Sequence, residues 1–281
     1  MSADPHDPLS ALRFQVEAGV DLALSEAPVD RFALSRAQAD ARGAPARAPA
    51  REPVPHAAVA EPEAEPAPVA APAFAVPSGN AVMAAREAAA SAGSLDELRA
   101  TLERFEGCNL RHTATNLVFG DGNPQARIMF VGEAPGMDED LQGRPFVGRS
   151  GQLLDRMMAA IGLDRTAAYI ANVIPWRPPG NRDPSPQETE ICKPFIARQI
   201  ELVDPAILVF LGNASTKQLL QTSEGITRMR GRWRDYPVGA RPVPAMPTFH
   251  PAYLLRQPLQ KKLAWRDLLA VKRALDDLPA A

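Results

Sequence analysis

Apolar residues are spread unevenly along the chain, and beyond residue 80 short continuous apolar runs alternate with segments of helical periodicity. Strands separated by helices pair in parallel through right-handed crossovers, and continuous apolar runs indicate burial on both faces of a sheet. The pattern predicts a three-layer α/β/α domain with a central, mostly parallel sheet of about four strands. The expected strands are 126–132, 167–174, 205–212 and 243–250, and the expected helices are 80–92, one beginning at Ser94, 152–163, 185–203, 213–221 and 259–278.

The pattern is different before residue 80. Apolar residues recur at helical spacing between Leu9 and Ser25, which predicts a short amphipathic helix. Residues 37–79 are dominated by Ala, Pro and Glu, so they cannot bury enough apolar surface to offset the entropy of ordering. We expect an amphipathic appendage over 1–36, a disordered linker over 37–79 and a globular domain over 80–281. The tail either docks a protein partner or has none, and the sequence leaves both interpretations open.

Charge is also divided between these parts. The formal net charge is −2, but residues 1–80 hold 11 acidic and 6 basic residues, whereas the remainder holds 22 and 25. A mildly basic domain is compatible with nucleic acid but does not require it. No apolar run approaches the ~18 residues of a transmembrane helix, and the N-terminus lacks the basic and apolar regions of a secretory signal. We therefore expect a cytoplasmic protein without membrane contact, and we expect a monomer because nothing in the linker indicates an oligomer.

Polar and aromatic residues gather in the loops that follow the four expected strands. Ligands of parallel α/β sheets bind beyond the carboxyl ends of the strands. The four loops together offer carboxylates, an amide, an imidazole and an aromatic ring, a set that can bind a planar heterocycle. Each signal is weak alone: Gly-Glu-Ala-Pro-Gly is neither a P-loop nor a dinucleotide fingerprint, and a strand-end asparagine is often only a turn residue.

Three segments in these loops carry a resemblance to a known family. GEAPGMDEDLQGRPFVGRSGQLL, NVIPWRPPGNRDPSPQE and PTFHPAYLLR resemble the three motif regions of the family 4 (thermophile-type) uracil-DNA glycosylases, over roughly Gly107 to Asp276. The resemblance implies a base excision repair enzyme that flips deoxyuridine out of DNA and hydrolyses its N-glycosidic bond, leaving an abasic site. The alternatives are a non-catalytic DNA-binding or replication-associated module of the same fold, and a hydrolase of another small nucleobase compound.

The resemblance also implies how the base is held. Phe146 matches the phenylalanine that stacks on the flipped uracil; otherwise it is a core residue beneath its loop. Asn172 matches the asparagine whose amide pairs with the uracil edge and favours uracil over cytosine. His250 matches the histidine that stabilises the departing uracil anion at O2. Gly132 and Ala134 are expected to allow the backbone to approach the base closely.

The carboxylate of the reaction is less clearly defined. Glu133 matches the motif glutamate, and we assign it to positioning water or stabilising the oxocarbenium ion. Glu139 and Asp140 are the alternative carboxylates, and they can equally form a solvated acidic turn.

Other residues are expected to contact DNA outside the base pocket. Tyr253, Leu254, Leu255 and Arg256 match the loop that enters the duplex, with an apolar wedge replacing the lost stacking and Arg256 reaching a phosphate. The further candidate phosphate contacts are Arg177, Arg182, Arg144 and Arg149, and also Arg228, Arg230, Arg232 and Arg234, which are otherwise exposed arginines on a strand.

The chain departs from the family at its four-cysteine iron–sulfur site. Cys108 and Cys192 occupy the second and fourth cysteine positions, whereas Phe105 and Trp176 stand in the first and third. Two thiolates cannot hold a four-iron cluster in the ordinary way. We therefore expect no cofactor, with the two cysteines as remnants of a metal site that aromatic side chains now fill.

Overall fold

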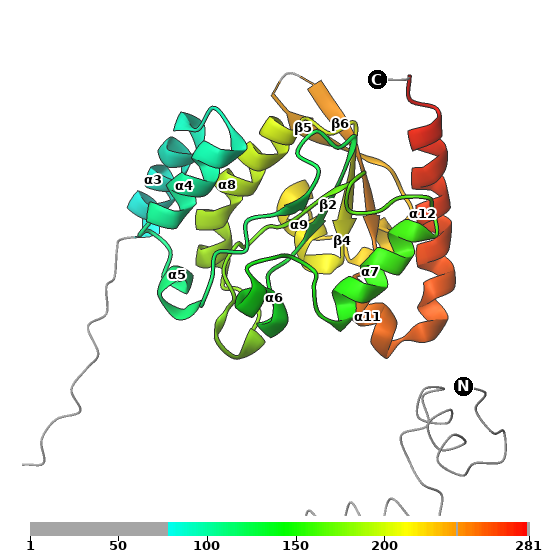
Figure 1. The fold of residues 1–281 in the computed structure, drawn as a ribbon, viewed down its shortest axis with the longest axis horizontal. Helices are drawn as coiled ribbons and strands as arrows, with labels where there is room; N and C mark the ends of the chain where they lie inside the picture. Colours follow the sequence, from blue (N-terminus) through cyan, green and yellow to red (C-terminus); the bar gives the residue numbers. More distant parts are fainter. Residues whose placement is uncertain (1–77, 240, 280–281) are drawn as a thin grey trace, which may run out of the picture. The chain divides into compact units, whose positions relative to one another are not determined.

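The structure is a computed structural model and describes residues 78–239 and 241–279 of the 281-residue chain (Figure 1). The expected appendage over 1–36 lies outside the described residues. So does the expected linker over 37–79, except for its last two residues, which begin helix α3 (Ser78–Ser91). The first described helix therefore starts two residues before the expected domain boundary, and the division of the preceding chain stays a prediction.

A six-stranded sheet forms the centre of the described domain, in the order β1-β3-β2-β4-β6-β5. The four inner strands are parallel and coincide with the four expected strands, whereas both edge strands run antiparallel to their neighbours. The sequence-based count of about four is too low because β1 has only two residues and β5 is a polar edge strand. The strands are β1 (Asp121–Gly122), β2 (Ile128–Gly132), β3 (Tyr169–Asn172), β4 (Ile207–Leu211), β5 (Arg234–Val238) and β6 (Arg241–Thr248).

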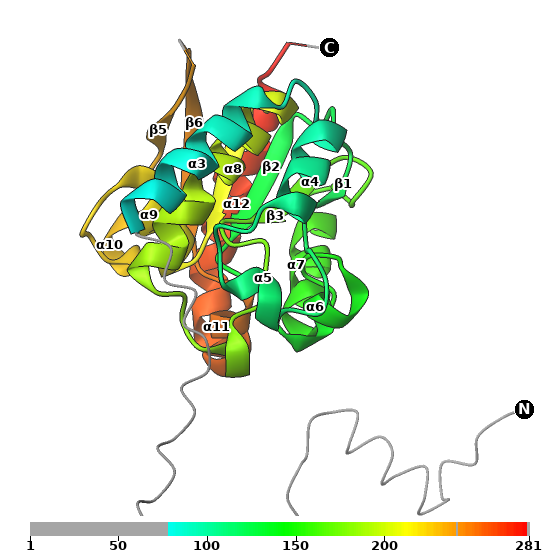
Figure 2. The same cartoon turned by 90° about the vertical axis from the view of Figure 1, so that its left-hand side faces the viewer.

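Side chains of the inner strands alternate between two hydrophobic cores, because successive residues of a strand point to opposite faces. In β2, Met129 and Val131 enter one core, and Ile128 and Phe130 enter the other. Figures 1 and 2 show the resulting three layers, with helices on both faces of the sheet. One core receives α3, α4 (Leu95–Arg104), α8 (Pro186–Val203) and α9 (Asn213–Leu220), and the other receives α7 (Arg149–Ala159), α11 (Pro251–Arg256) and α12 (Lys261–Asp276).

The helices begin where local capping chemistry allows. Ser94 accepts a hydrogen bond from the Glu97 amide at 3.2 Å, as its position before α4 predicts. At α8 the Ser185 hydroxyl accepts a hydrogen bond from the Glu188 amide, and the Glu188 carboxylate accepts one from the Ser185 amide at 2.7 Å.

Helix α7 begins three residues before its expected start. Short elements without a sequence signal are α5 (Leu110–Thr113), α6 (Met137–Gln142), α10 (Ile226–Met229), η1 (Pro179–Asn181) and η2 (Pro258–Gln260).

Over the described residues, none of the helices has both the length and the apolar character needed to cross a lipid bilayer.

Candidate active site

A cavity of about 770 Å³ lies at the carboxyl ends of the parallel strands. The loops that follow β2, β3, β4 and β6 all contribute to its wall, so the four expected strand-end loops do meet at one site. The predicted site residues that line it are Glu133, Ala134, Glu139, Phe146, Asn172, Arg182, His250, Tyr253 and Arg256.

Asn172 lines this cavity and carries a buried, unsatisfied amide oxygen. The residue ends β3, opposite Gly132 at the end of β2, and its side chain is buried. The Asn172 Oδ1 atom has no hydrogen-bond partner among the described residues. Leaving such an acceptor buried and unpaired costs about 1–3 kcal/mol, so the geometry suits a ligand that donates a hydrogen bond.

Gly132 provides the space that the Asn172 amide occupies. A Cβ atom at Gly132 would overlap Asn172 Oδ1 and would lie 2.6 Å from Phe146 Cζ. Any larger residue would therefore displace the amide, the aromatic ring, or both. The space at Gly132 therefore accommodates these two side chains, and the expected close approach of its backbone to a base stays a prediction.

The Phe146 ring is buried in the core below the site and also lines the cavity. Its backbone has a φ of 55°, a left-handed conformation that a bulky residue adopts only when its surroundings enforce it. Arg165 donates a hydrogen bond to the Phe146 carbonyl, and a Cβ atom at Gly151 would overlap that carbonyl. The ring centroid lies 5.6 Å from that of His250 at an interplanar angle of 32°, so the two rings form adjacent walls.

Two of the three candidate carboxylates have structural roles. The Glu139 carboxylate accepts hydrogen bonds from the amides of Gly136, Val147 and Gly148 at 3.0–3.1 Å. Asp140 accepts from the amides of Thr115 and Asn116 at 2.8 and 3.1 Å. Both side chains are buried, so the interpretation of this segment as a solvated acidic turn is wrong.

Glu133 is the remaining candidate, half-buried in the cavity wall. Burial raises the pKa of its carboxyl, and the nearby negative charge of Asp183 raises it further. Asp183 also lines the cavity; it was not predicted as a site residue, although it lies in the expected loop after β3. Asn213 was missed in the same way: its side chain accepts a hydrogen bond from the Ile226 amide at 3.1 Å and joins α10 to the rim.

His250 is held as a neutral imidazole with a defined tautomer. Its Nδ1 atom accepts a hydrogen bond from the Ala252 amide at 3.1 Å, which caps the start of α11. Burial lowers the pKa of His250 to about 4, and the positive charge of Arg256 contributes to the shift. At neutral pH the single ring proton is therefore on Nε2, which is left as a hydrogen-bond donor. Gly212 allows this placement, because a Cβ atom there would lie 2.8 Å from His250 Cβ.

Comparison with known proteins places the chain in a family. Residues 119–269 match the family model described as the uracil DNA glycosylase superfamily. The chain is 40% identical over 184 residues to a type-4 uracil-DNA glycosylase of Sulfurisphaera tokodaii, covering 64% of this chain and 84% of the relative. It is 41% identical over 169 residues to one of Archaeoglobus fulgidus (59% and 85%) and 43% over 156 residues to one of Thermotoga maritima (55% and 80%). The chain belongs to the uracil-DNA glycosylase superfamily.

The residues of the expected wedge in this superfamily member separate into two groups. Leu254 is buried and packs in the core with α7 and α12, so its expected insertion into the duplex is incompatible with the structure. Tyr253 is partly buried and packs against Phe249, with ring centroids 5.0 Å apart. Leu255 is 38% exposed and Arg256 is exposed, so these two remain available to DNA.

Several of the expected phosphate contacts are already engaged in ion pairs. Arg182 forms a bidentate pair with Glu188 at 2.6 and 2.9 Å. Arg177 donates to Asn181 at 2.6 Å, and its guanidinium lies 3.9 Å from Asp140. Arg230 lies on the turn after α10 and not on a strand. It is paired with buried Asp267, and its guanidinium lies over the Phe249 ring. Arg144 pairs with Asp121 at 3.0 Å and Arg234 with Glu224 at 3.6 Å, whereas Arg149, Arg228 and Arg232 are exposed.

The cysteine positions of the superfamily member do not fit an iron–sulfur cluster. Cys108 and Cys192 are fully buried with their Sγ atoms 3.9 Å apart, and the contact with Cys108, together with burial, raises the pKa of Cys192. Phe105 packs edge-to-face on Phe195 at 4.9 Å, and Trp176 is buried in the same core. Over the part of the chain that the structure describes, no three His, Cys, Asp or Glu side chains are grouped to hold a metal ion.

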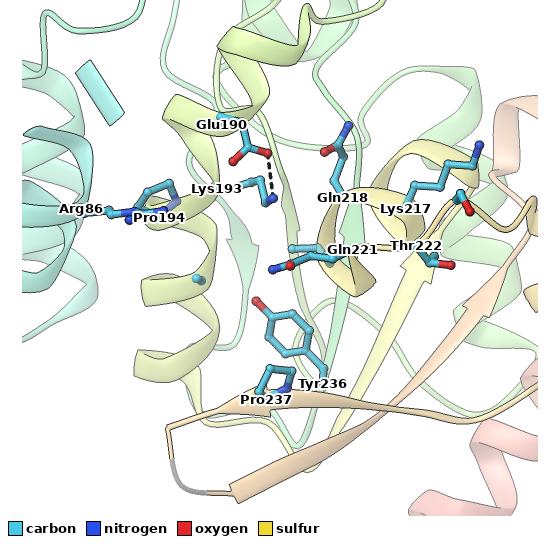
Figure 3. Close-up of a pocket in the computed structure, with 13 residues that line it drawn as sticks. Arg86, Glu190, Lys193, Pro194, Lys217, Gln218, Gln221, Thr222, Tyr236 and Pro237 are labelled. Atoms are coloured by element: carbon cyan, nitrogen blue, oxygen red, sulfur yellow. Dashed lines mark hydrogen bonds and ion pairs between the residues drawn. The ribbon is translucent and has the colours of Figure 1, made fainter. Parts of the chain in front are cut away.

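A second cavity, of about 830 Å³, lies between α8, α9 and β5 (Figure 3). It shares no lining residue with the candidate active site and contains none of the predicted site residues. Lys193 in its wall is paired with Glu190 at 2.9 Å, and burial raises the pKa of Tyr236 to about 12. Although this cavity is larger, its wall does not contain the Asn172 amide, the His250 imidazole or the Phe146 ring that line the first cavity.

Proposed function

We propose that the protein hydrolyses the N-glycosidic bond of deoxyuridine in DNA and leaves an abasic site, as part of base excision repair. The observation that carries the proposal is the buried, unpaired Oδ1 atom of Asn172, a residue that lines one cavity together with His250 and Phe146. The similarity to proteins named type-4 uracil-DNA glycosylase supports the same activity.

Recognition of uracil follows from the amide of Asn172. Its oxygen accepts a hydrogen bond from the N3–H of uracil, and its NH₂ group donates to O4. Cytosine has an acceptor at N3 and a donor at C4, so both contacts are mismatched. One buried mispaired group costs about 1–3 kcal/mol, and two such groups discriminate strongly against the normal base.

Bond cleavage places negative charge on the uracil and positive charge on the sugar. The neutral His250 Nε2–H donates a hydrogen bond to uracil O2, where the negative charge develops. The Phe146 ring stacks on the base and sets its plane. The Glu133 carboxylate, when ionised, stabilises the oxocarbenium ion or orients the attacking water.

Outside the pocket, Leu255 and Arg256 are the exposed residues of α11 and are suited to the DNA side of the rim. Leu255 fills the space of the flipped nucleotide, and Arg256 contacts a phosphate.

No cluster is assigned to this protein, because two thiols and two aromatic side chains do not form a ligand set for four irons. Analysis of iron and sulfide in protein purified without oxygen tests this. Background metal with no visible absorption band is expected, and stoichiometric iron and sulfide would contradict it. A cytoplasmic location, a monomeric state, the absence of membrane contact and a protein partner for the N-terminal tail also remain predictions.

A uracil-containing oligonucleotide tests the function directly. After incubation with the protein, alkali cleaves the strand wherever uracil has been removed. Wild-type protein is expected to give strand cleavage with uracil and none with a matched thymine oligonucleotide. Binding of both oligonucleotides without any cleavage would instead favour the non-catalytic DNA-binding module.

A further inference from the structure

An exposed surface beside the active site combines positive charge with large apolar side chains. It is formed by η2 and the first two turns of α12, and we call it the α12 patch: Leu259, Lys261, Lys262, Trp265 and Arg266. Leu259 is 91% exposed and Trp265 is 41% exposed, and the three cations are exposed as well. Soluble proteins seldom leave such apolar side chains on one face without a partner.

The charge of the α12 patch is not neutralised locally. None of its three cations forms an ion pair with another described residue. The only acidic residue between Lys261 and Arg273 is Asp267, which is buried and paired with Arg230. Lysines in the first turn are also repelled by the helix dipole, so they do not stabilise α12. The patch therefore suits a negatively charged partner.

The position of the α12 patch near the active-site cavity favours DNA as the negatively charged partner. His250 caps the start of α11, Arg256 at its end lines the active-site cavity, and η2 packs against both α11 and α12. Figure 1 shows α12 starting next to α11 and running away from it along the side of the sheet. The patch thus continues the rim on which Leu255 and Arg256 lie, so a DNA strand leaving the site on this side would meet it.

We propose that the α12 patch binds the DNA that flanks the flipped nucleotide. Lys261, Lys262 and Arg266 contact phosphates, and Trp265 and Leu259 pack on the sugars or bases between them. At 1.5 Å per residue, Lys261 to Arg266 spans about 7.5 Å along α12, comparable with the rise of about two nucleotides along the duplex axis. The inference rests on the proposed function for where the flipped nucleotide lies. DNA binding by the α12 patch does not depend on that function.

Equilibrium binding to a fluorescent duplex without uracil tests the α12 patch independently of catalysis. The variant Lys261→Gln/Lys262→Gln/Arg266→Gln is compared with a control of equal charge, Arg86→Gln/Arg104→Gln/Lys217→Gln, on α3, α4 and α9. The patch variant should bind roughly tenfold more weakly at low salt, and its log–log salt slope should be smaller by about 2–3. Trp265→Ala should weaken binding roughly threefold or more without changing the slope.

Excision kinetics then distinguish the two proposals. On a uracil-containing duplex, the patch variant should show a raised KM and an unchanged kcat, because no patch residue lines the cavity. If wild type does not excise uracil but the patch variant still binds DNA more weakly than the control, the proposed function fails and the binding surface stands. If patch and control variants bind DNA equally, the inference is overturned and the surface is left to a protein partner.

Discussion

Gly132 and Asn172 are the last residue pair of the β2–β3 ladder, and the absence of a side chain at Gly132 leaves room for the Asn172 amide. The Asn172 amide is therefore positioned by the central sheet and not by a loop. A site on a rigid element holds its geometry more precisely than one on a loop.

The first prediction concerns this pair. Gly132→Ala should lower kcat/KM for uracil excision by roughly 100-fold, because a displacement of about 1 Å in a positioned group costs that much. The control is Gly79→Ala, since a Cβ atom there meets nothing within 4 Å. Single-turnover excision rates of the two variants measure the effect, and equal rates would show that the Gly132–Asn172 contact has no role.

The second prediction separates the carboxylates. Glu139→Gln should destabilise the fold by about 1–3 kcal/mol, because a neutral amide cannot accept all three backbone hydrogen bonds well. Glu133→Gln should leave stability within about 0.5 kcal/mol of wild type and reduce excision by roughly 100-fold. Thermal unfolding and excision rates together test the assignment, which fails if Glu139→Gln is as stable as wild type or if Glu133→Gln retains full activity.

The third prediction concerns acid stability. The pKa of His250 is lowered from 6.5 to about 4 in the folded protein, so between these values the unfolded state binds more protons than the folded state. The stabilising contribution is present above pH 6.5 and is lost as the pH falls towards 4. His250→Gln should therefore lose less stability over this range than wild type, and parallel curves of unfolding free energy against pH would contradict the neutral imidazole.

The fourth prediction follows from the different environments of two adjacent leucines. Leu254→Ala should destabilise the protein by about 2–5 kcal/mol, because it opens a cavity in the core. Leu255→Ala should leave the melting temperature unchanged and lower excision from duplex DNA more than from single-stranded DNA. If Leu255→Ala slowed both substrates equally, it would not be the residue that replaces the flipped nucleotide.

Much of the fold and the position of the site were predictable from the sequence. The four inner strands are continuous apolar runs because both of their faces are covered, and their parallel direction brings the strand-end loops together. Gly132, Phe146, Asn172 and His250 were identified by their motifs and do come together around one cavity or support it.

The details that sequence could not give depend on tertiary packing. An acidic run such as Asp138 to Asp140 has the composition of a solvated turn, and only the backbone amides that fold around Glu139 and Asp140 make it structural. Likewise, the core that α11 packs against decides which of Leu254 and Leu255 is buried. Strand β5 was not among the expected strands, although its first residue, Arg234, had been considered as a strand residue. Its polar residues carry no strong strand signal, and its pairing with β6 stabilises it.

The most direct test of the account is single-turnover excision of uracil by wild type and by the Asn172→Ala/His250→Ala variant. The account predicts strand cleavage by wild type and a rate reduced by at least roughly 1,000-fold in the variant, because removing one positioned donor alone costs about 100–1,000-fold. Thymine-containing DNA serves as the substrate control and thermal unfolding as the control for folding. Cleavage by a folded variant at a rate close to that of wild type would contradict the site.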